Sequence, residues 1–552
     1  MEQLIARALT LDERLSWARR NGHRSHSRPG RSATECVKEC KRWFTKSGDR
    51  SAWKEFLDSV HISESGLVEL VDITELPNRW SEWAITLRRL LCASGSASSR
   101  PATTQRAAEN MARPAVRFAW QELVRAVPEE QFRNLSGSTT RRLRDSLLGR
   151  LAGSARAVTE WESKTNGVHA LFGDGADSAM TATLWRYPAL ARLWAQQINN
   201  WTSFVTEFLA HADSFLRDRS KLQSNRVRIS SLDPDLSDLH HRNRSVFRVG
   251  LTDGTIWFFK PRSGEQEAGW FALLSSLNCQ GFSHQFKIPR LIRSEDAFWM
   301  EAILRHPCRN RAEACCYFFR AGALLYLAHL LKGVDLHAGN IVAHRSDPVF
   351  VDCETLLHPR IRVPPFARKQ QRGVLRTGLL PVEPSNDSVR DNVSGYGRCA
   401  AGAHRVGIRC RPAFARDFVD EVIAGFSAMH AFLTSDKGKG FSEMAARHLP
   451  KVGRRIYRPT SYYEAILDRS LGPRLMINGF ERSLFLQAAL RSDLAPSRHL
   501  QSEVAALEAA DTPHLMGKVT QPHEPLDIAA TRESLILIRN SFANHEGDSH
   551  AR

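Results

Sequence analysis

One stretch of the chain limits the possible folds more than any other. An apolar segment, AEACCYFFRAGALLYLAHLL at 312–331, has the length and composition of a buried helix. The polar loop GVDLHAGN (333–340) follows, and then two apolar stretches, IVA (341–343) and VFV (349–351), that are separated by HRSDP. This pattern predicts a buried helix that ends at Gly333, a loop and a hairpin. Because four polar side chains of the loop and hairpin converge beside buried elements, we expect a site there rather than a surface turn.

The length of 552 residues is too great for a single ordinary core, so we expect two or more domains. Helical periodicity dominates the first 230 residues, strand signals follow, and helical periodicity returns from about residue 400. We predict a helical N-terminal region at 1–230, a small β-rich lobe at 231–305 and a large helical lobe at 306–545. A small β-rich lobe before a large helical lobe is the order of a kinase-like fold.

The β-rich segment places a lysine at the end of a strand. RSVFRVGL (244–251) and TIWFFK (255–260) flank the turn TDG and predict a hairpin that ends at Lys260. A helix is expected at 267–277, and strands are expected around 286–293 and 297–304. Because Pro261 follows Lys260, its ammonium group can extend from the end of the strand into a cleft.

These residues suit phosphoryl transfer. That reaction requires a cation on the nucleotide phosphates, ligands for Mg²⁺ and a group beside the attacking hydroxyl. Lys260 suits the first role, and Asp335 suits the last. Asn340 and Asp352 offer oxygen ligands for Mg²⁺. Glu354 lies two residues beyond Asp352, on the same face if the strand continues, and is a further candidate for the metal.

Six motifs resemble, in order and spacing, those of the dehydratase region of class II lanthipeptide synthetases. They are SDLH (237–240), FFKPRS (258–263), GVDLHAGN (333–340), VFVDCETL (349–356), RTGLLP (376–381) and RRIYRPT (454–460). The resemblance runs from about residue 180 to 540. It implies an α+β fold with a lipid-kinase-like bilobal catalytic core, a largely helical N-terminal region and a helical C-terminal lobe.

The resemblance also implies an activity. The family uses ATP and Mg²⁺ to phosphorylate Ser and Thr of a leader-bearing precursor peptide, and then eliminates the phosphate to leave dehydroalanine or dehydrobutyrine. The residues that match its phosphorylation residues are Lys260, Asp335, His337, Asn340, Asp352 and Glu354. Asp238 and His240 match its phosphate-loop residues, and Arg454 and Thr460 match a pair used in elimination. A guanidinium binds phosphate through two parallel hydrogen bonds, so Arg454 suits a departing phosphate.

The sequence departs from the family at several points. Ser237 and Asn243 stand where the family usually has glycine, and Gly339 stands where an acidic residue is common. Because glycine lets a backbone approach a phosphate closely, we expect weaker nucleotide binding. The last cysteine is Cys410, and no Cys or His set with zinc-ligand spacing follows it. We therefore expect no zinc and no thioether ring closure by this chain, and a separate cyclase is a candidate partner.

Other functions fit part of the same pattern. A peptide kinase that stops at phosphorylation needs the same residues, and an inactive peptide-binding scaffold would have lost ATP through its altered phosphate loop. The excess of 77 − 59 = 18 positive charges favours an acidic partner. ATP and an acidic leader explain it as well as nucleic acid does, and we expect no nucleic-acid partner because no motif for one is present. With neither a secretory signal nor an apolar run of membrane length, the sequence predicts a soluble cytoplasmic protein without a membrane span.

Overall fold

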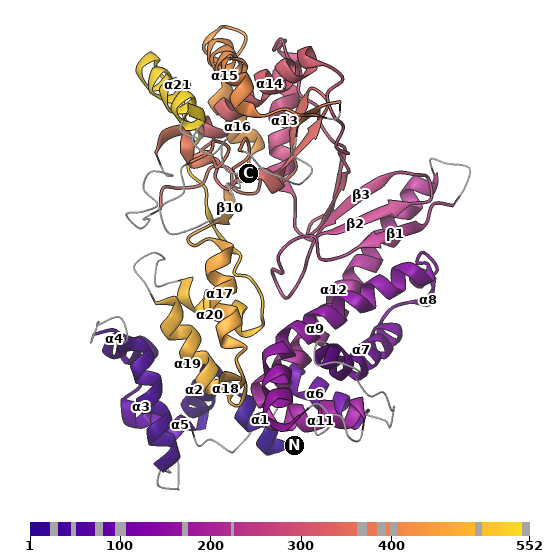
Figure 1. The fold of residues 1–552 in the computed structure, drawn as a ribbon, viewed down its shortest axis with the longest axis vertical. Helices are drawn as coiled ribbons and strands as arrows, with labels where there is room; N and C mark the ends of the chain where they lie inside the picture. The colour runs from indigo at the N-terminus through magenta and orange to yellow at the C-terminus, as the bar shows by residue number, and fades with distance from the viewer. Residues whose placement is uncertain are drawn as a thin grey trace. The chain divides into compact units, whose positions relative to one another are not determined.

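The computed structural model describes residues 1–21, 31–45, 51–71, 81–93, 106–167, 175–221, 226–361, 372–382, 394–397, 406–409, 411–491 and 499–543. The chain forms two compact units, each built from two separate segments. Unit 1 comprises Met1–Gly254 and Arg458–Pro513, and unit 2 comprises Thr255–Tyr457 and His514–Arg552. Both units contain helices and strands, so the α+β class is confirmed (Figure 1). The three domain ranges and the lipid-kinase-like core remain predictions.

Helices make up most of unit 1. Its N-terminal segment contains α1 (Glu2–Ala8), α2 (Leu11–Asn21), α3 (Arg31–Thr45), α4 (Ala52–Val60), α5 (Glu64–Val71), α6 (Glu82–Cys92), α7 (Ala107–Ala126), α8 (Glu129–Phe132), α9 (Gly137–Asn166), α11 (Ala176–Arg186) and α12 (Pro188–Lys221). The sequence segments 187–198 and 201–216, which have helical periodicity, lie in the continuous helix α12 except for Tyr187, which precedes it. Its buried face includes Trp194, Trp201 and Phe208, which explains why the helix is stable at this length.

The second segment of unit 1 completes the core of the first. It contains α17 (Thr460–Ser470), α18 (Pro473–Met476), α19 (Gly479–Leu490) and α20 (Leu500–Glu508). Phe480 and Leu484 of α19 belong to the same buried cluster as Phe44 and Trp53 from the N-terminal helices. A Cβ atom on Gly479 would stand 2.3 Å from the carbonyl oxygen of Ala8, so glycine permits this close contact. Unit 1 therefore needs both of its segments to bury this core.

Two strands of unit 1 carry a loop between them. β1 (Ile229–Asp233) pairs antiparallel with β2 (Phe247–Leu251), and Leu232 lies opposite Val249. Both of these side chains are buried. The connecting loop, residues 234–246, contains the candidate residues Asp238 and His240.

Three strands and a helix form the β-rich part of unit 2. β3 (Ile256–Lys260) pairs with β5 (Phe298–Glu301), which also pairs with β4 (Leu291–Arg293), and both pairings are antiparallel. Helix α13 (Glu265–Cys279) lies between β3 and β4 in the sequence. The helix predicted at 267–277 and the strands predicted around 286–293 and 297–304 are thus confirmed, with shorter strands than expected.

The predicted buried helix is α14 (Arg311–Leu330), and it packs closely against α15 (Val419–Thr434). A Cβ atom on Gly322 would stand 1.9 Å from the carbonyl oxygen of Val422, and one on Gly425 would stand 1.8 Å from that of Phe319. Glycine on both helices therefore allows their backbones to touch. At the end of α14, Lys332 adopts a φ of 51°, and the Gly333 N–H donates to Ala328 O at 2.8 Å. The helix end predicted at Gly333 is therefore formed by Lys332 and Gly333 together.

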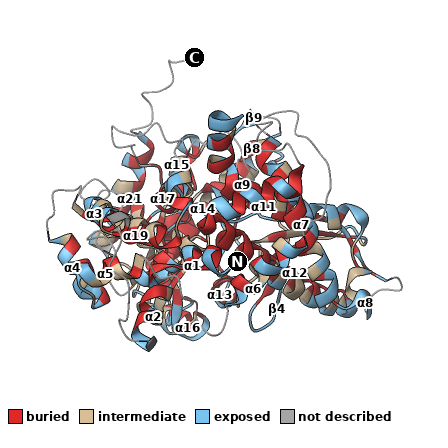
Figure 2. Ribbon diagram, turned by 90° about the horizontal axis from the view of Figure 1, so that it is seen from below, coloured by how far each residue is buried: buried red, intermediate tan, exposed pale blue. Residues whose placement is uncertain are grey.

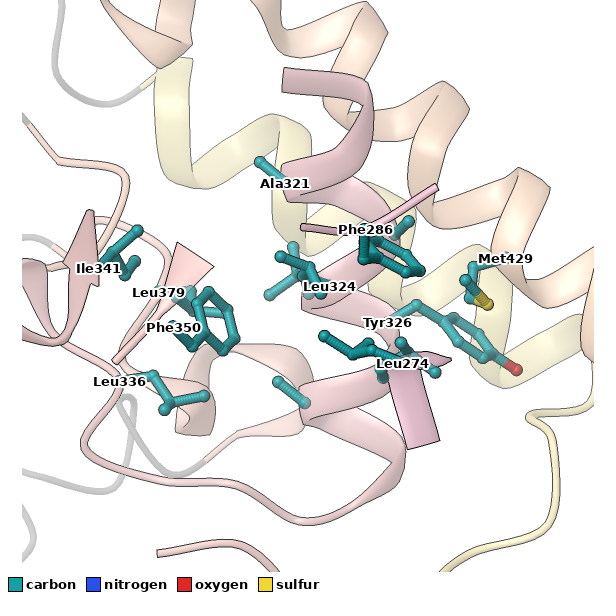
Figure 3. Packing of buried hydrophobic residues seen from close by; sticks show 14 of the residues in the cluster. Leu274, Phe286, Ala321, Leu324, Tyr326, Leu336, Ile341, Phe350, Leu379 and Met429 are labelled. Carbon is teal, nitrogen blue, oxygen red and sulfur yellow. The ribbon is translucent and has the colours of Figure 1, made fainter. Parts of the chain in front are cut away.

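The loop and hairpin after α14 are anchored in a large buried cluster of unit 2 (Figure 3). The 3₁₀ helix η2 (Ala338–Asn340) leads into β6 (Ile341–His344), which pairs with β7 (Asp347–Phe350). Leu336, between the candidate residues Asp335 and His337, is fully buried with Ile341 and Phe350. The apolar residues of this segment thus fix the backbone from which the polar ones extend.

The rest of unit 2 consists of short elements and three helices. They are η5 (Gly373–Thr377), β8 (Gly407–Ile408), β9 (Arg411–Pro412), η6 (Ala415–Phe418), α16 (Phe441–His448), β10 (Val452–Arg455), β11 (Leu515–Lys518) and α21 (Ile528–Ala543), with α15 among them. β10 and β11 pair antiparallel, although about 60 residues separate them in the sequence. In Figure 2, buried and exposed residues occur on the same helices. None of the helices in the described ranges has both the length and the hydropathy of a membrane span.

Candidate active site

Lys260 occupies the last position of β3, where its side chain is buried. The strand register places it opposite Phe298 of β5, and Nζ lies 5.7 Å from the centre of the Phe298 ring. Nζ donates a hydrogen bond to Val351 O at 2.6 Å and lies 3.7 Å from Asp352 Oδ2. The ammonium group is therefore held beside Asp352.

Arg262 is the centre of a cluster of carboxylates that sequence analysis did not single out. Its guanidinium forms ion pairs with Glu267 of α13, with Asp352 at 3.0 Å and with Glu354. Glu267 is 1% exposed, so the cluster reaches into the protein interior. A buried carboxylate is stable there only because a cation is paired with it. Arg262 therefore connects α13 to the segment that follows β7.

The start of α13 depends on a glycine. Gly264 precedes the helix with a φ of 64°, a conformation that favours glycine. A Cβ atom at this position would stand 2.5 Å from the ring of Phe298. Gly264 therefore lets α13 begin close to β5, which brings Glu267 within reach of Arg262.

Glu354 is bound on both oxygens by arginines from different parts of unit 2. Arg454 of β10 donates to Oε1, and Arg262 donates to Oε2. His514, just before β11, places Nε2 3.4 Å from Oε2. Burial opposes ionisation, but Arg262, Arg454 and His514 outweigh it and hold the pKa of Glu354 well below its usual range. Glu354 is therefore ionised at neutral pH and ties β10 to the segment that follows β7.

Asp352 is the most accessible carboxylate of this cluster, with 27% of its side chain exposed. Burial alone would raise its pKa, but the charges of Arg262 and Lys260 lower it below the usual value. Asp352 is therefore ionised and partly open to solvent, as a metal ligand must be.

The loop before β6 brings Asp335, His337 and Asn340 together. His337 Nδ1 accepts the Gly339 N–H at 3.0 Å, and Asn340 Nδ2 donates to Asp335 O at 2.9 Å and lies 3.4 Å from His337 Nε2. Asp335 adopts a φ of 59°, which costs on the order of 1 kcal/mol and which Asp tolerates better than most residues. The neighbouring Leu336 N–H donates to Thr377 O at 3.0 Å, which helps hold this backbone.

Asp335 is also coupled electrostatically to the cluster. Asp335 is an exposed residue, and desolvation by the surrounding protein raises its pKa above the usual value. The charges of His337 and Arg454 lower the pKa, and those of Asp352 and Glu354 raise it further. The net rise makes Asp335 a better proton acceptor than an ordinary carboxylate.

The donor set of this region fits Mg²⁺. The cation prefers carboxylate and amide oxygens, which Asp352 and Asn340 offer. Because Asn340 Nδ2 donates to Asp335 O, the amide oxygen of Asn340 is the atom that can face a cation. Glu354 fits less well, since an arginine binds each of its oxygens. Asp352 and Asn340 are therefore the residues that would hold the metal, and a metal role for Glu354 stays a prediction.

The motif at 376–381 supports the segment that follows Glu354. Arg376 donates to the carbonyl oxygens of His358 and Pro359 at 2.9 and 2.5 Å. His358 is fully buried, and its Nε2 accepts the Ile456 N–H at 3.0 Å. Burial lowers the pKa of His358 to about 4, so the ring is neutral and can accept this hydrogen bond. The motif thus contributes a structural link to the strand that carries Arg454.

Asp238 and His240 belong to unit 1. Asp238 is exposed. His240 is partly buried, and its Nδ1 bonds Thr512 O at 2.8 Å. A turn follows, in which His240 and Arg244 exchange backbone hydrogen bonds of 3.0 and 2.8 Å. The loop is therefore held by the segment that follows α20.

The structure accounts for asparagine, in place of the family's glycine, at position 243. Its φ is 60°, a left-handed conformation that glycine favours and asparagine tolerates. The side chain is fully buried, accepts a hydrogen bond from Asn200 at 3.0 Å, and donates to the carbonyl oxygens of Ala509 and Ala510 at 3.3 and 3.4 Å. Asn243 therefore secures the turn to α12 and to the end of α20. The expected weakening of nucleotide binding stays a prediction.

Thr460 also lies in unit 1, as the first residue of α17, and is partly buried. Arg454, its partner in the motif, belongs to unit 2. Between them, Arg458 is buried in unit 1, where it pairs with Glu503 at 3.0 Å. The motif RRIYRPT therefore spans the boundary between the two units.

Three residues of the cluster were missed from the sequence: Arg262, Glu267 and His514. Arg262 could have been found, because it lies two residues beyond Lys260 in the motif FFKPRS. Glu267 and His514 carried no such signal, since they reach the cluster only through the packing of α13 and the pairing of β11 with β10.

The chain matches a family model and is similar to a known protein. A family model described as "Domain of unknown function (DUF4135)" matches residues 187–406 and 397–516. The "Lacticin 481/lactococcin biosynthesis protein LcnDR2" of Lactococcus lactis subsp. lactis is 20% identical over 342 residues. The aligned region is 52% of this chain and 36% of that protein, so the match covers about a third of the relative's length.

Proposed function

We propose that this chain, which belongs to the DUF4135 family, is a lanthipeptide-type dehydratase. It would use ATP and Mg²⁺ to phosphorylate Ser and Thr of a leader-bearing, ribosomally made precursor peptide, and would then eliminate the phosphate. The similarity to a protein named for lacticin 481 and lactococcin biosynthesis supports this substrate class. The observation that carries the proposal is one cluster in unit 2 that joins Lys260, Asp352, Glu354 and Arg454 through Arg262.

The phosphorylation step rests on five residues. Lys260 neutralises negative charge on the phosphate that is transferred, and Asp335 accepts the proton of the substrate hydroxyl. His337 lies beside Asn340 and keeps the loop in place. Asp352 and Asn340 would hold Mg²⁺, and ATP bound with the metal would supply the phosphoryl group. The raised pKa of Asp335 favours its role as the proton acceptor.

The elimination step rests on Arg454. Removal of the α-proton leaves an electron pair that forms the Cα–Cβ double bond, while the Cβ–O bond breaks and inorganic phosphate departs. A guanidinium stabilises that departing charge, and Glu354 holds Arg454 beside the cluster. Thr460 is proposed to assist in the same step, and Asp238 and His240 are proposed to contact the nucleotide phosphates. Over both steps the substrate residue loses one water.

We also propose a cytoplasmic location, because ATP and newly made precursor peptide are both present there. A separate cyclase is the proposed partner for ring closure. The residues that carry the activity suggest no role for nucleic acid.

Mass spectrometry tests the proposal directly. A Ser- and Thr-rich precursor peptide, ideally one encoded beside this gene, is incubated with the protein, ATP and Mg²⁺. A loss of one water per modified residue is expected. Lys260→Ala and Asp352→Asn should leave the peptide unchanged, whereas Arg454→Ala should accumulate phosphopeptide. Arg539→Ala is the control, because its ion pair with Asp420 is exposed and outside the cluster.

The possible outcomes separate the alternatives. Stable phosphorylation by the wild-type protein would show a kinase without elimination. An unchanged peptide together with no ATP binding would favour the inactive scaffold. Full dehydration by Arg454→Ala would contradict the role of that residue. Thermal unfolding of each variant shows whether a loss of activity reflects a loss of fold.

A further inference from the structure

The paired strands β10 and β11 form a ribbon whose two faces differ in exposure. On one face, Gly453, Arg455 and Leu515 are buried or nearly so. On the other, Val452 and Met516 are each 48% exposed. These two half-exposed apolar side chains lie on the same face of the ribbon, on its two strands.

Arg454 shares the exposed face with these two residues. The register pairs Arg454 with Met516 and Val452 with Lys518. Directly opposite residues have Cβ atoms about 5 Å apart, and residues two apart on one strand are about 7 Å apart. Met516 and Val452 are therefore the nearest exposed neighbours of Arg454 on the ribbon. Arg454 itself reaches Glu354, so this face extends from the catalytic cluster toward solvent.

We propose that this face of the ribbon binds the precursor peptide on either side of the residue being modified. The proposal rests on the proposed function, because it takes Arg454 as the residue that meets the phosphate, and Val452 and Met516 are its exposed neighbours on the ribbon. In an extended peptide, side chains two positions apart point the same way and are about 7 Å apart. The face therefore selects an apolar side chain two positions from the modified Ser or Thr.

A second copy of the chain is a poorer occupant. Stable protein interfaces bury roughly 1,200–2,000 Å² in total, which far exceeds what two half-exposed side chains and their strand can supply. The positive charge of Lys518, opposite Val452, and of Arg454 instead suits a phosphorylated peptide.

Peptide binding tests the proposal without requiring turnover. The probes are fluorescent synthetic peptides with one central phosphoserine and either Leu or Gly two positions before or after it. We expect the wild-type protein to bind at least one Leu peptide about tenfold more tightly than its Gly counterpart, as burial of one apolar side chain predicts. Met516→Ala or Val452→Ser should remove this preference, so that the Leu and Gly peptides bind the variant with equal affinity.

Ile536→Ala is the matched control, because Ile536 is a 60% exposed apolar residue on α21 of the same unit. It should keep the preference. Equal binding of Leu and Gly peptides by the wild-type protein would overturn the proposal, as would a preference that survives both ribbon substitutions. If the preference is found and lost as expected but phosphate never leaves the peptide, the surface is supported and the elimination step of the proposed function is wrong.

Discussion

Replacing Glu354 by Gln should destabilise unit 2 far more than the removal of an ordinary surface charge. The substitution keeps the shape of the side chain and removes the negative charge that two guanidiniums and His514 share. Arg262 retains Glu267 and Asp352 as partners. Arg454, with 15% of its side chain exposed, loses its one ion pair among the described residues. The main cost is therefore one guanidinium that is left partly buried without its carboxylate.

The size of the effect follows from the ion pairs that the substitution removes. Breaking a buried ion pair costs roughly 3–5 kcal/mol, and the lower end applies because Arg262 stays paired. For a domain of this size, about 3 kcal/mol corresponds to a fall in Tm of roughly 6–12 °C. The loss of position at Arg454 should also make phosphopeptide accumulate, as expected for Arg454→Ala.

Circular dichroism during heating measures the change. Glu533→Gln is the control, because its pair with Arg372 is exposed, with 57% and 67% of the side chains accessible, and should change the free energy of unfolding by less than about 0.5 kcal/mol. Adding Arg454→Met to Glu354→Gln should restore part of the lost Tm, since it removes the unpaired charge. A Glu354→Gln protein that melts within about 2 °C of the wild type would refute the assignment of this cluster as a buried charge network.

Three further predictions concern the fold. Asn243→Gly suits the left-handed backbone but removes hydrogen bonds to three partners. Chemical denaturation should therefore show a loss of about 1–3 kcal/mol in the free energy of unfolding. An unchanged value would mean that the side chain does not secure the turn. Burial raises the pKa of Asp511 from 3.8 to about 6, so the native state binds its proton more tightly, and stability should fall by up to about 3 kcal/mol as pH rises from about 4 to about 6. Asp511→Asn should flatten that dependence, and an unaltered pH profile would argue against it. Gly425→Ala should lower the free energy of unfolding by at least about 3 kcal/mol, because its Cβ would lie 1.8 Å from Phe319 O. Gly153→Ala is the control, because a Cβ there would meet nothing within 4 Å and should stabilise helix α9. Equal melting temperatures of the two variants would contradict the close helix contact.

Local pattern predicted the elements around the cluster better than it predicted the cluster itself. Helix α14 and the strands β6 and β7 were visible because periodicity and apolar runs report which residues are buried. The position of Lys260 at a strand end followed from the same signal. The role of Arg262 did not, because it depends on Glu267 from a helix and on carboxylates about 90 residues away.

The loop at Asn243 shows a different reason for failure. The resemblance to a family with glycine at this position predicted weaker nucleotide binding, because the sequence shows only that the conformational freedom of glycine is missing. The structure shows that asparagine adopts the left-handed conformation and uses its amide to bind α12 and the end of α20. Tertiary hydrogen bonds of this kind cannot be read from a local pattern.

The division of unit 1 into two segments has a consequence for how the protein is made. The segment Met1–Gly254 lacks Phe480 and Leu484, which complete its buried cluster with Phe44 and Trp53. The ribosome must therefore reach residue 513 before unit 1 can close, after it has synthesised all of Thr255–Tyr457. At roughly 5–20 residues per second, this leaves an incomplete apolar core open for about 10–50 seconds on every nascent chain. During that interval the N-terminal helices are a natural client for a holding chaperone, and an expression host with slow translation through this region should give more aggregated product.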